Sequence, residues 1–342
     1  MRSPLVSVIM PVYNVENYVG AAVGSVLNQT YGNFELLIVD DCSPDRSIEV
    51  VRSFGDKRIR IIRHDCNRGL AHARNSAISA SRGSLLAFLD SDDAMVKHRL
   101  AKQTRFMHGH PDIALCGGWV RRMSQDGVID PREHRITIDP DAVNASLVFT
   151  NLFNASTIMM RREAVPDGGF RNIFAEDYEF LVRVASRYRL GFLREVLACY
   201  RQNPTGIMRN TTTEKILQDQ WKARFILLDL LGVAATSHYR DAHFSIIDRE
   251  GNLDVDEVKC LHQWFMTLVE ANNRARLFEP AAFERAASYV WFSHLYRASG
   301  SGFEAVKLLF SSTLGFQHSQ PATTLFKFFV KAMMHRPFRR DE

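Results

Sequence analysis

The sequence predicts an α/β fold in which a largely parallel β-sheet is covered by helices on both faces and is followed by a helical region. Three observations carry this prediction. Short apolar runs alternate with helical patterns in the N-terminal part of the chain. These runs contain few polar residues, which is typical of strands that are buried on both faces. From Thr211 onward, helical periodicity replaces the strand pattern.

The N-terminal part is expected to consist of alternating strands and helices. The strands span residues 5–10, 34–39, 59–62 and 85–89, and the helices span residues 17–28, 45–54 and 70–81. Pro11 stops the first apolar run, and aspartates follow the second and the fourth. Ligands of such sheets bind beyond the carboxyl ends of the strands. We therefore expect the functional site where the polar residues that follow these strands come together.

The rest of the chain is expected to contain a mixed region and then helices. Strands are predicted over residues 114–120, 157–161 and 191–200, with a helix over 178–187. Beyond a boundary within residues 204–211, helices are predicted over residues 216–231, 255–273, 280–299, 303–311 and 323–334. A chain of 342 residues is long enough for one large domain and a smaller one.

The composition is that of an ordinary globular protein, with 46% apolar and 24% charged residues. A formal charge of +5 is too small for nucleic-acid binding to be expected. The five cysteines are scattered and never form a CxxC spacing, which favours a reducing compartment over a disulfide framework or a zinc site. There is no uninterrupted run of 18 apolar residues and no signal-peptide pattern, so we expect a cytoplasmic protein.

The sequence FLDSDD, Phe88–Asp93, carries the strongest chemical signal. A predicted strand delivers Asp90, Asp92 and Asp93 to the edge of the sheet. Carboxylates packed together repel one another and are tolerated best where a cation neutralises them. Mg²⁺ or Mn²⁺ held by one or two carboxylates completes its shell with substrate phosphates and water. The alternative is a solvated loop in which Asp92 or Asp93 caps the following helix.

Three further motifs each have a functional and a structural interpretation. Asp40 and Asp41, in LLIVDDCS, can accept hydrogen bonds from a base and from ribose hydroxyls, or can form a turn and a helix cap. Arg74, in NRGLAHARN, can reach a carboxylate, base or phosphate, or can form a structural ion pair. Glu176 and Asp177, in FAEDYEF, stand at a helix start, where capping is the structural interpretation.

Taken in order, PVYN, VDDCS, NRGLAHARN, FLDSDD and AEDYEF closely resemble the motifs of family 2 glycosyltransferases of the GT-A fold. The resemblance implies a GT-A catalytic domain over residues 1–205, with a nucleotide-sugar half to residue 110 and an acceptor half from residue 111. Residues 206–342 would form a helical C-terminal region. The resemblance also implies an inverting transfer from a nucleotide-sugar, expected to be a UDP-sugar, to an acceptor hydroxyl.

The resemblance further assigns roles to individual residues. The positions that match the nucleotide-sugar site are Pro11, Tyr13, Asp40, Asp41, Arg74 and Asp90. By this match, Arg74 lies near the base and Asp90 faces the ribose. The uracil and ribose pocket is lined by Pro11, Tyr13 and Asp41, with Asp40 beside them. Asp92 matches the ligand of a Mn²⁺ or Mg²⁺ cofactor, and Asp177 matches the general base.

The chain also departs from the family pattern. Asn203 stands where the closing YRxH element commonly has histidine, which leaves open any metal or diphosphate contact of that histidine. Ser76 replaces a frequent glycine, which we interpret as neutral. The Gln-x-x-Arg-Trp element of processive members is absent, which favours one sugar per acceptor. Residues 154–162 and 168–171 resemble enzymes of bacterial surface polysaccharides, so exopolysaccharide, capsule or lipopolysaccharide assembly is the expected setting.

Two other classes of protein fit parts of the sequence. A dinucleotide-binding oxidoreductase needs a glycine-rich turn after the first strand, and PVYNVEN contains no GxGxxG. A binding-only relative of the transferases is disfavoured because Asp92 and Asp177 are both retained.

The segment 323–340 is predicted to contain an amphipathic helix. Basic side chains recur every four residues along it, at Lys327, Lys331 and His335. A wide apolar face with a basic stripe suits an anionic membrane, where a lipid-linked saccharide acceptor would be presented to a peripheral protein on the inner face. In the alternative, Phe326, Phe329 and Met333 pack onto the catalytic domain and the lysines are solvated.

Overall fold

The computed structural model describes residues 3–133, 139–203, 213–234, 243, 254–298, 303–314 and 322–333. The chain forms two compact units. The first comprises Met1–Thr137 and Leu152–Gln220, and the second comprises Ile138–Asn151 and Trp221–Glu342. A segment from the middle of the sequence therefore belongs to the C-terminal unit. The division into a catalytic and a helical region near residue 205 concerns function and stays a proposal.

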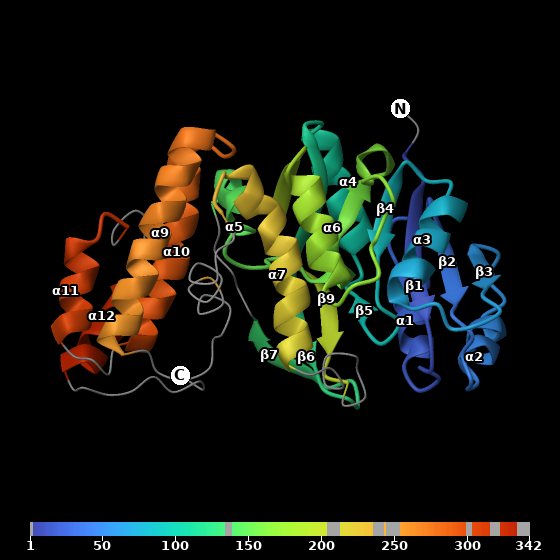
Figure 1. The fold of residues 1–342 in the computed structure, drawn as a ribbon. Helices are drawn as coiled ribbons and strands as arrows, with labels where there is room; N and C mark the ends of the chain where they lie inside the picture. The colour runs from blue at the N-terminus through green and yellow to red at the C-terminus, as the bar shows by residue number, and fades with distance from the viewer. Residues whose placement is uncertain are drawn as a thin grey trace. The chain divides into compact units, whose positions relative to one another are not determined.

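The N-terminal half of the first unit is a parallel sheet (Figure 1). Strand β1 (Val6–Val12) lies between β2 (Phe34–Asp40) and β4 (Leu85–Phe88), and β3 (Ile59–Arg63) pairs with the outer edge of β2. All four predicted strands are confirmed. Every residue of β1 and β2 is buried, in agreement with their lack of polar alternation. Because Val12 pairs with Asp40, the chain leaves both strands at the same edge of the sheet.

The second half of the sheet is mixed in direction. Strand β8 (Met159–Arg161) is antiparallel to β4 and to β6 (Ile113–Met123), and β9 (Arg189–Arg201) is parallel to β6. The short strands β5 (Ala94–Met95) and β7 (Ile129–Glu133) pair with β9 and β6 respectively. Strands β4 and β9 consequently run in the same direction, which brings the residues that follow β4 close to the end of β9.

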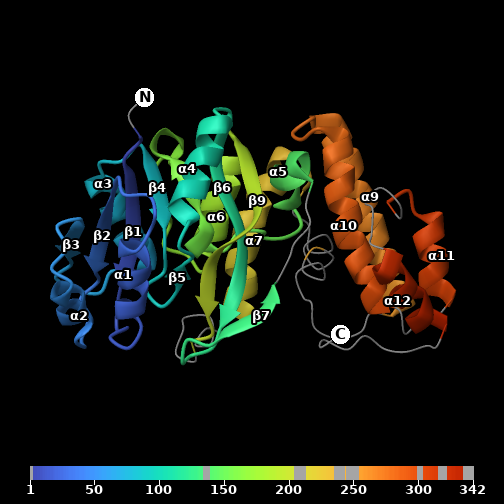
Figure 2. The same cartoon turned by 180° about the vertical axis from the view of Figure 1, so that it is seen from behind.

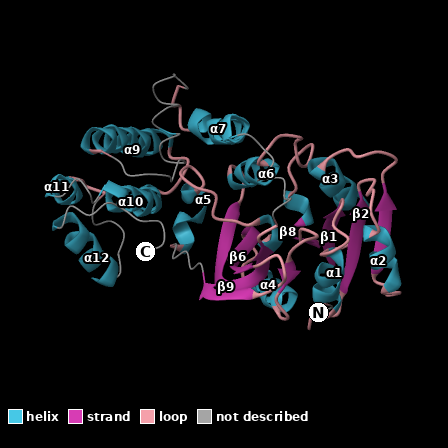
Figure 3. Ribbon diagram, turned by 90° about the horizontal axis from the view of Figure 1, so that it is seen from below, coloured by secondary structure: helices cyan, strands magenta, loops and turns pink. Residues whose placement is uncertain are grey.

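Helices cover both faces of the sheet, as predicted (Figure 3). One face carries α1 (Val19–Leu27), α2 (Ser47–Ser53) and α4 (Arg99–Gly109), and the other carries α3 (Leu70–Ala80) and α6 (Glu176–Ala185). Periodicity predicts one apolar face of α1, and of its members Val19, Ala22, Val23 and Val26 are buried whereas Leu27 is partly buried. The site is therefore built from α3, from α6 and from the loops that follow the parallel strands.

The second unit is helical, as predicted (Figure 2). Its helices are α5 (Val143–Ser146), α9 (Val255–Ala275), α10 (Pro280–Arg297), α11 (Phe303–Ser311) and α12 (Ala322–Met333), and α7 (Thr213–Leu230) enters it from the first unit. Among these α-helices, α5 has no counterpart in the prediction. Its neighbour Phe149 stacks on Phe265 of α9, with ring centroids 5.3 Å apart, which explains why this segment belongs to the second unit.

The tail prediction needs correction. Lys331 is not part of an exposed stripe, because its side chain is buried and its ammonium lies 5.3 Å from the centre of the Tyr296 ring. The packing alternative is also wrong for two residues, since Phe326 and Met333 are 69% and 75% exposed. Among the apolar residues of α12 whose side chains the structure describes, Phe328 and Ala332 are buried. His335 lies outside the described residues.

The composition predicts neither a membrane-spanning helix nor a disulfide framework, and the described residues can be checked for both. No helix in the described ranges combines the length and the apolarity needed to cross a membrane. All five cysteines are free, so no disulfide links them.

Candidate active site

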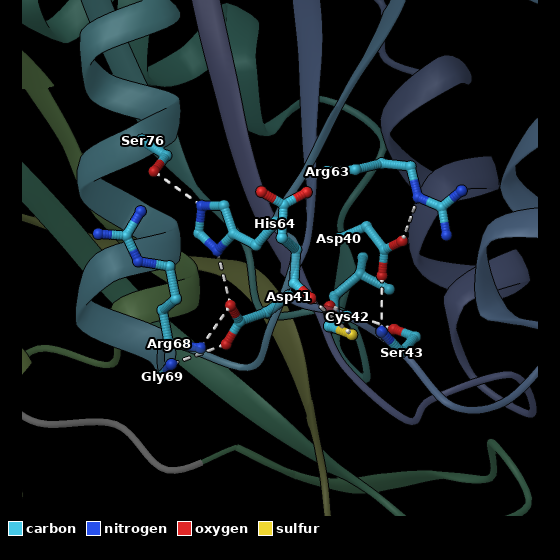
Figure 4. Close-up of polar contacts among 11 residues, drawn as sticks. Asp40, Asp41, Cys42, Ser43, Arg63, His64, Arg68, Gly69 and Ser76 are labelled. Carbon is cyan, nitrogen blue, oxygen red and sulfur yellow. Dashed lines mark hydrogen bonds and ion pairs between the residues drawn. The ribbon is translucent and has the colours of Figure 1, made fainter.

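Asp40 ends β2 and holds the turn that follows it (Figure 4). One carboxylate oxygen accepts the backbone N–H of Ser43 at 2.9 Å, and the other accepts Nε of Arg63 at 3.0 Å. The residue is completely buried. These contacts match the structural interpretation of Asp40, in which it forms a turn at the end of the strand.

Asp41 fixes the loop between β3 and α3 (Figure 4). Its carboxylate accepts the backbone N–H groups of Arg68 and Gly69 at 2.9 and 2.8 Å and contacts Nδ1 of His64 at 2.6 Å. The other ring nitrogen of His64 lies 2.9 Å from the Ser76 hydroxyl. Ser76 is therefore not a neutral departure, because it supports the histidine that holds Asp41. Three of roughly four acceptor positions on the Asp41 carboxylate are filled, and the side chain is 5% exposed.

Pro11 and Tyr13 lie at the end of β1, next to the Asp41 turn. Pro11 is buried in the strand and pairs with Val39, whereas Tyr13 follows the strand and is 46% exposed. The backbone N–H of Asp41 bonds to the carbonyl of Val12, so the two strand ends are joined. The exposed Tyr13 ring provides a surface on which a planar base can stack.

Arg74 lies between the strand end and α6. Its guanidinium donates to Asp90 at 2.8 Å and to Glu176 at 2.5 Å, and it lies 5.2 Å from the centre of the Phe170 ring. The side chain is 2% exposed. These contacts match the structural interpretation of Arg74, which is an ion pair.

The loop after β4 holds three carboxylates in different environments. Asp93 is buried, where it accepts hydrogen bonds from the Ser156 hydroxyl at 2.6 Å and from the backbone N–H of Arg201 at 2.8 Å. Asp92 accepts a hydrogen bond from the Asn203 amide at 3.0 Å, so the residue at the usual histidine position contacts the predicted metal ligand. Helix α4 begins only at Arg99 and has no side-chain cap, so the proposed cap by Asp92 or Asp93 is wrong.

The charges of this loop favour a cation. Burial, and then the neighbouring Asp90, raises the pKa of Asp92. Burial together with Asp90 and Asp92 raises the pKa of Asp93 well above its usual range. A divalent ion would relieve this repulsion. Within the described ranges, no three His, Cys, Asp or Glu side chains are placed to hold a metal by themselves. Asp92 with Asp90 beside it nevertheless fits Mg²⁺ or Mn²⁺, which normally takes its remaining ligands from phosphates and water.

Two buried residues that the sequence analysis did not identify, Ser156 and Arg99, support the loop after β4 and the end of that strand. Ser156 is completely buried and also accepts the backbone N–H of Asp90 at 3.0 Å. Arg99 is completely buried and donates to the carbonyls of Phe88 and Ile158. Arg99 lies in no motif of the sequence analysis, and the resemblance of residues 154–162 gives Ser156 no chemical role, so no local signal predicts these contacts.

Asp177 lies in the first turn of α6, after Ala175 in the left-handed region at φ 60°. It is partly buried and accepts the backbone N–H of Tyr178 at 2.7 Å. Burial, followed by the charge of Glu176, raises the pKa of Asp177 to about 6, while Arg74 acts in the opposite direction. A carboxylate with such a pKa can accept a proton efficiently near neutral pH.

Similarity to known proteins agrees with this arrangement. The family model described as glycosyl transferase family 2 matches residues 7–169. A glycosyltransferase of Haemophilus influenzae, described as uncharacterized, is 35% identical over 193 residues, which cover 53% of this chain and 72% of that protein. The chain belongs to glycosyl transferase family 2. It is a glycosyltransferase, and the oxidoreductase alternative is excluded.

Other relatives and one solved structure extend the comparison. The Escherichia coli UDP-Glc:alpha-D-GlcNAc-diphosphoundecaprenol beta-1,3-glucosyltransferase WfgD is 30% identical to this family 2 chain over 224 residues, 65% of the chain and 85% of the relative. The crystal structure of Staphylococcus aureus TarS 1–349 with UDP-GlcNAc superposes with a TM-score of 0.56 at 18% identity, covering 96% of this chain and 90% of that one. The likeness to TarS confirms the GT-A fold.

If Asp177 is the general base, its raised pKa predicts the pH dependence of sugar transfer. Only the ionised carboxylate can take a proton, so kcat/KM is expected to fall about tenfold per pH unit below about pH 6 and to level off above it. The shift also means that the folded state loses stability as pH rises from 3.8 towards about 6. Initial rates at low donor concentration, measured between roughly pH 4.5 and 8, show this fall in kcat/KM at acidic pH. A fall that is centred near the ordinary value of 3.8 would contradict the assignment of Asp177 as the base.

Proposed function

We propose that this chain is a metal-dependent, inverting and non-processive glycosyltransferase that moves one sugar from a UDP-sugar to an acceptor hydroxyl. The observation that supports it best is the Arg74 bridge, which brings Asp90 after β4 next to Glu176 at the start of α6. The carboxylates of the donor side and the candidate base Asp177 thus share one edge of the sheet.

The proposed reaction is a single displacement. The acceptor oxygen forms a bond to the anomeric carbon while the bond from that carbon to the diphosphate breaks, and Asp177 takes the acceptor proton. A bound divalent ion supplies positive charge for the leaving diphosphate. Asp92 would hold that ion, Asp90 would contact the ribose, and Tyr13 and the open position on Asp41 would contact the base. Since Asp40 and Arg74 are engaged with protein groups, they would act on the nucleotide indirectly.

The named relatives suggest the setting. WfgD is named for transfer to a sugar carried on diphosphoundecaprenol, and a Bacillus subtilis relative that is 33% identical is named as a putative teichuronic acid biosynthesis enzyme. We infer that this chain acts in the assembly of a bacterial surface polysaccharide, on a saccharide acceptor that is carried by a lipid. The inferred location is the cytoplasmic face of the plasma membrane.

A donor screen tests the proposal. The purified protein is incubated with UDP- and GDP-sugars, Mn²⁺ and a short saccharide linked to a lipid diphosphate, and release of nucleoside diphosphate is followed. We expect release from one UDP-sugar, dependent on both acceptor and metal, and a product with inverted anomeric configuration. Release from GDP-sugars alone, or a retained configuration, would contradict the donor or the mechanism.

Membrane contact, which this proposal includes, is assigned to exposed apolar residues of the second unit. Phe303 and Phe310 of α11 are 76% and 62% exposed, and Phe326 and Met333 of α12 are similarly exposed. Phe310 stacks against Phe329 of α12, so these faces meet. The two helices carry one acidic residue against three lysines, of which Lys307 and Lys327 are exposed. This combination suits an anionic membrane surface.

The double variant Phe326→Ser and Met333→Ser is expected to lose co-sedimentation with anionic vesicles. Both side chains are largely exposed, so the fold should be retained, as measured by thermal unfolding. Binding of the unchanged protein should also decrease with salt and be weak on neutral vesicles. Anionic-vesicle binding that the double variant retains would place the membrane contact elsewhere.

A further inference from the structure

The guanidinium of Arg74 is held by protein groups. Both terminal nitrogens of the guanidinium donate to carboxylates, one to Asp90 and one to Glu176, and its plane lies near the Phe170 ring. With 2% of the side chain exposed, a bound nucleotide has little access to it. Breaking a buried ion pair by withdrawing one partner is strongly unfavourable, so these contacts should persist when substrate binds.

The next residue makes a second link to the same loop. The Asn75 amide donates to the carbonyl of Phe170 at 2.8 Å and accepts the backbone N–H of Phe170 at 2.8 Å. The loop approaches closely, because a Cβ at Gly169 would lie 2.2 Å from the Asn75 side-chain oxygen. Gly169 also has a φ of +60°, which favours glycine. Two adjacent residues of α3 thus hold the segment that leads into α6.

We propose that Arg74 and Asn75 are positioning residues that hold the start of α6, and with it Asp177, against the donor-side strand end at Asp90. This proposal rests on the proposed function and assigns Arg74 a role other than contact with the base. The three segments involved are distant in the sequence, and no other described ion pair joins the loop after β4 to α6. Since a displacement of about 1 Å in a reacting group can cost about 10² in rate, this link has a direct catalytic consequence.

The variant Arg74→Lys distinguishes a positioning role of Arg74 from a contact with the base. A lysine cannot bridge two carboxylates with a fixed planar fork. If Arg74 positions α6, kcat at saturating donor should fall by about 10- to 100-fold, and the Kd for UDP with Mn²⁺, measured by calorimetry, should stay within about threefold. Amide hydrogen exchange over residues 170–178 should become faster. If Arg74 instead contacts the base, the UDP Kd should rise at least about tenfold with kcat nearly unchanged, which would overturn the proposal.

Asn75→Ala and a control variant complete the test. Asn75→Ala removes the loop contact and leaves both Arg74 ion pairs possible, so it should lower kcat and speed exchange in the same segment even if Arg74→Lys folds poorly. The control is Arg60→Lys, which weakens the Arg60–Glu35 ion pair and should leave kcat unchanged. An equal loss of kcat in Arg60→Lys, Arg74→Lys and Asn75→Ala would overturn the proposal. UDP binding and hydrogen exchange need no sugar transfer, so a wrong donor sugar or acceptor leaves both readouts interpretable.

Discussion

Replacing Asp177 with asparagine is expected to lower kcat by about 10²–10⁴ and to leave UDP and metal binding within a few-fold of the unchanged enzyme. Asparagine is nearly isosteric, and its amide oxygen can still accept the hydrogen bond from the Tyr178 backbone N–H. It cannot accept a proton from the acceptor hydroxyl. Initial rates at saturating donor, together with calorimetric titration of UDP in the presence of Mn²⁺, measure the two effects separately.

Glu179→Gln is the matched control for this variant. Glu179 also lies in the first turn of α6, but it is 1% exposed and paired with Arg171 and Arg183. Its substitution should lower the melting temperature and leave kcat within a few-fold. Normal turnover by the Asp177→Asn enzyme would show that the base is elsewhere, with Glu176 and then Glu179 as the next candidates.

Asp92→Ala is expected to abolish metal-stimulated transfer and to weaken UDP binding in the presence of Mn²⁺. Removing a group that stabilises developing charge can cost about 10²–10³ in rate. The partly buried position of Asp92 next to Asp90, which raises the pKa of Asp92, indicates a carboxylate that a cation would stabilise. Transfer rates and UDP affinity are measured across a Mn²⁺ titration and after removal of metal with EDTA.

Asp93→Asn separates metal binding from structural support of the same loop. Asp93 holds Ser156 and the backbone of Arg201, so its substitution should destabilise the protein without removing the stimulation by metal. Full activity of the unchanged enzyme in EDTA, or of Asp92→Ala, would refute the metal assignment.

The local chemistry of the sequence was sufficient to predict the framework of the fold. Apolar runs without polar alternation predicted β1 and β2, in which every residue is buried, because burial on both faces favours apolar side chains. The helix predicted over residues 303–311 matches α11, since helical periodicity is a property of neighbouring residues. The site at the carboxyl ends of the strands followed from the same pattern, because parallel strands end at a common edge.

The partners of the individual side chains were decided only by the tertiary structure. Arg74 meets Asp90 and Glu176 because α3, the loop after β4 and the start of α6 converge, and no pattern within any of these segments specifies that meeting. For the same reason Ser156 could not be recognised as the residue that holds Asp93. In the tail, periodicity placed Lys327 and Lys331 in one stripe, but packing against Tyr296 buries only Lys331. Local periodicity determines which elements form, whereas contacts between distant segments determine what each polar side chain can do.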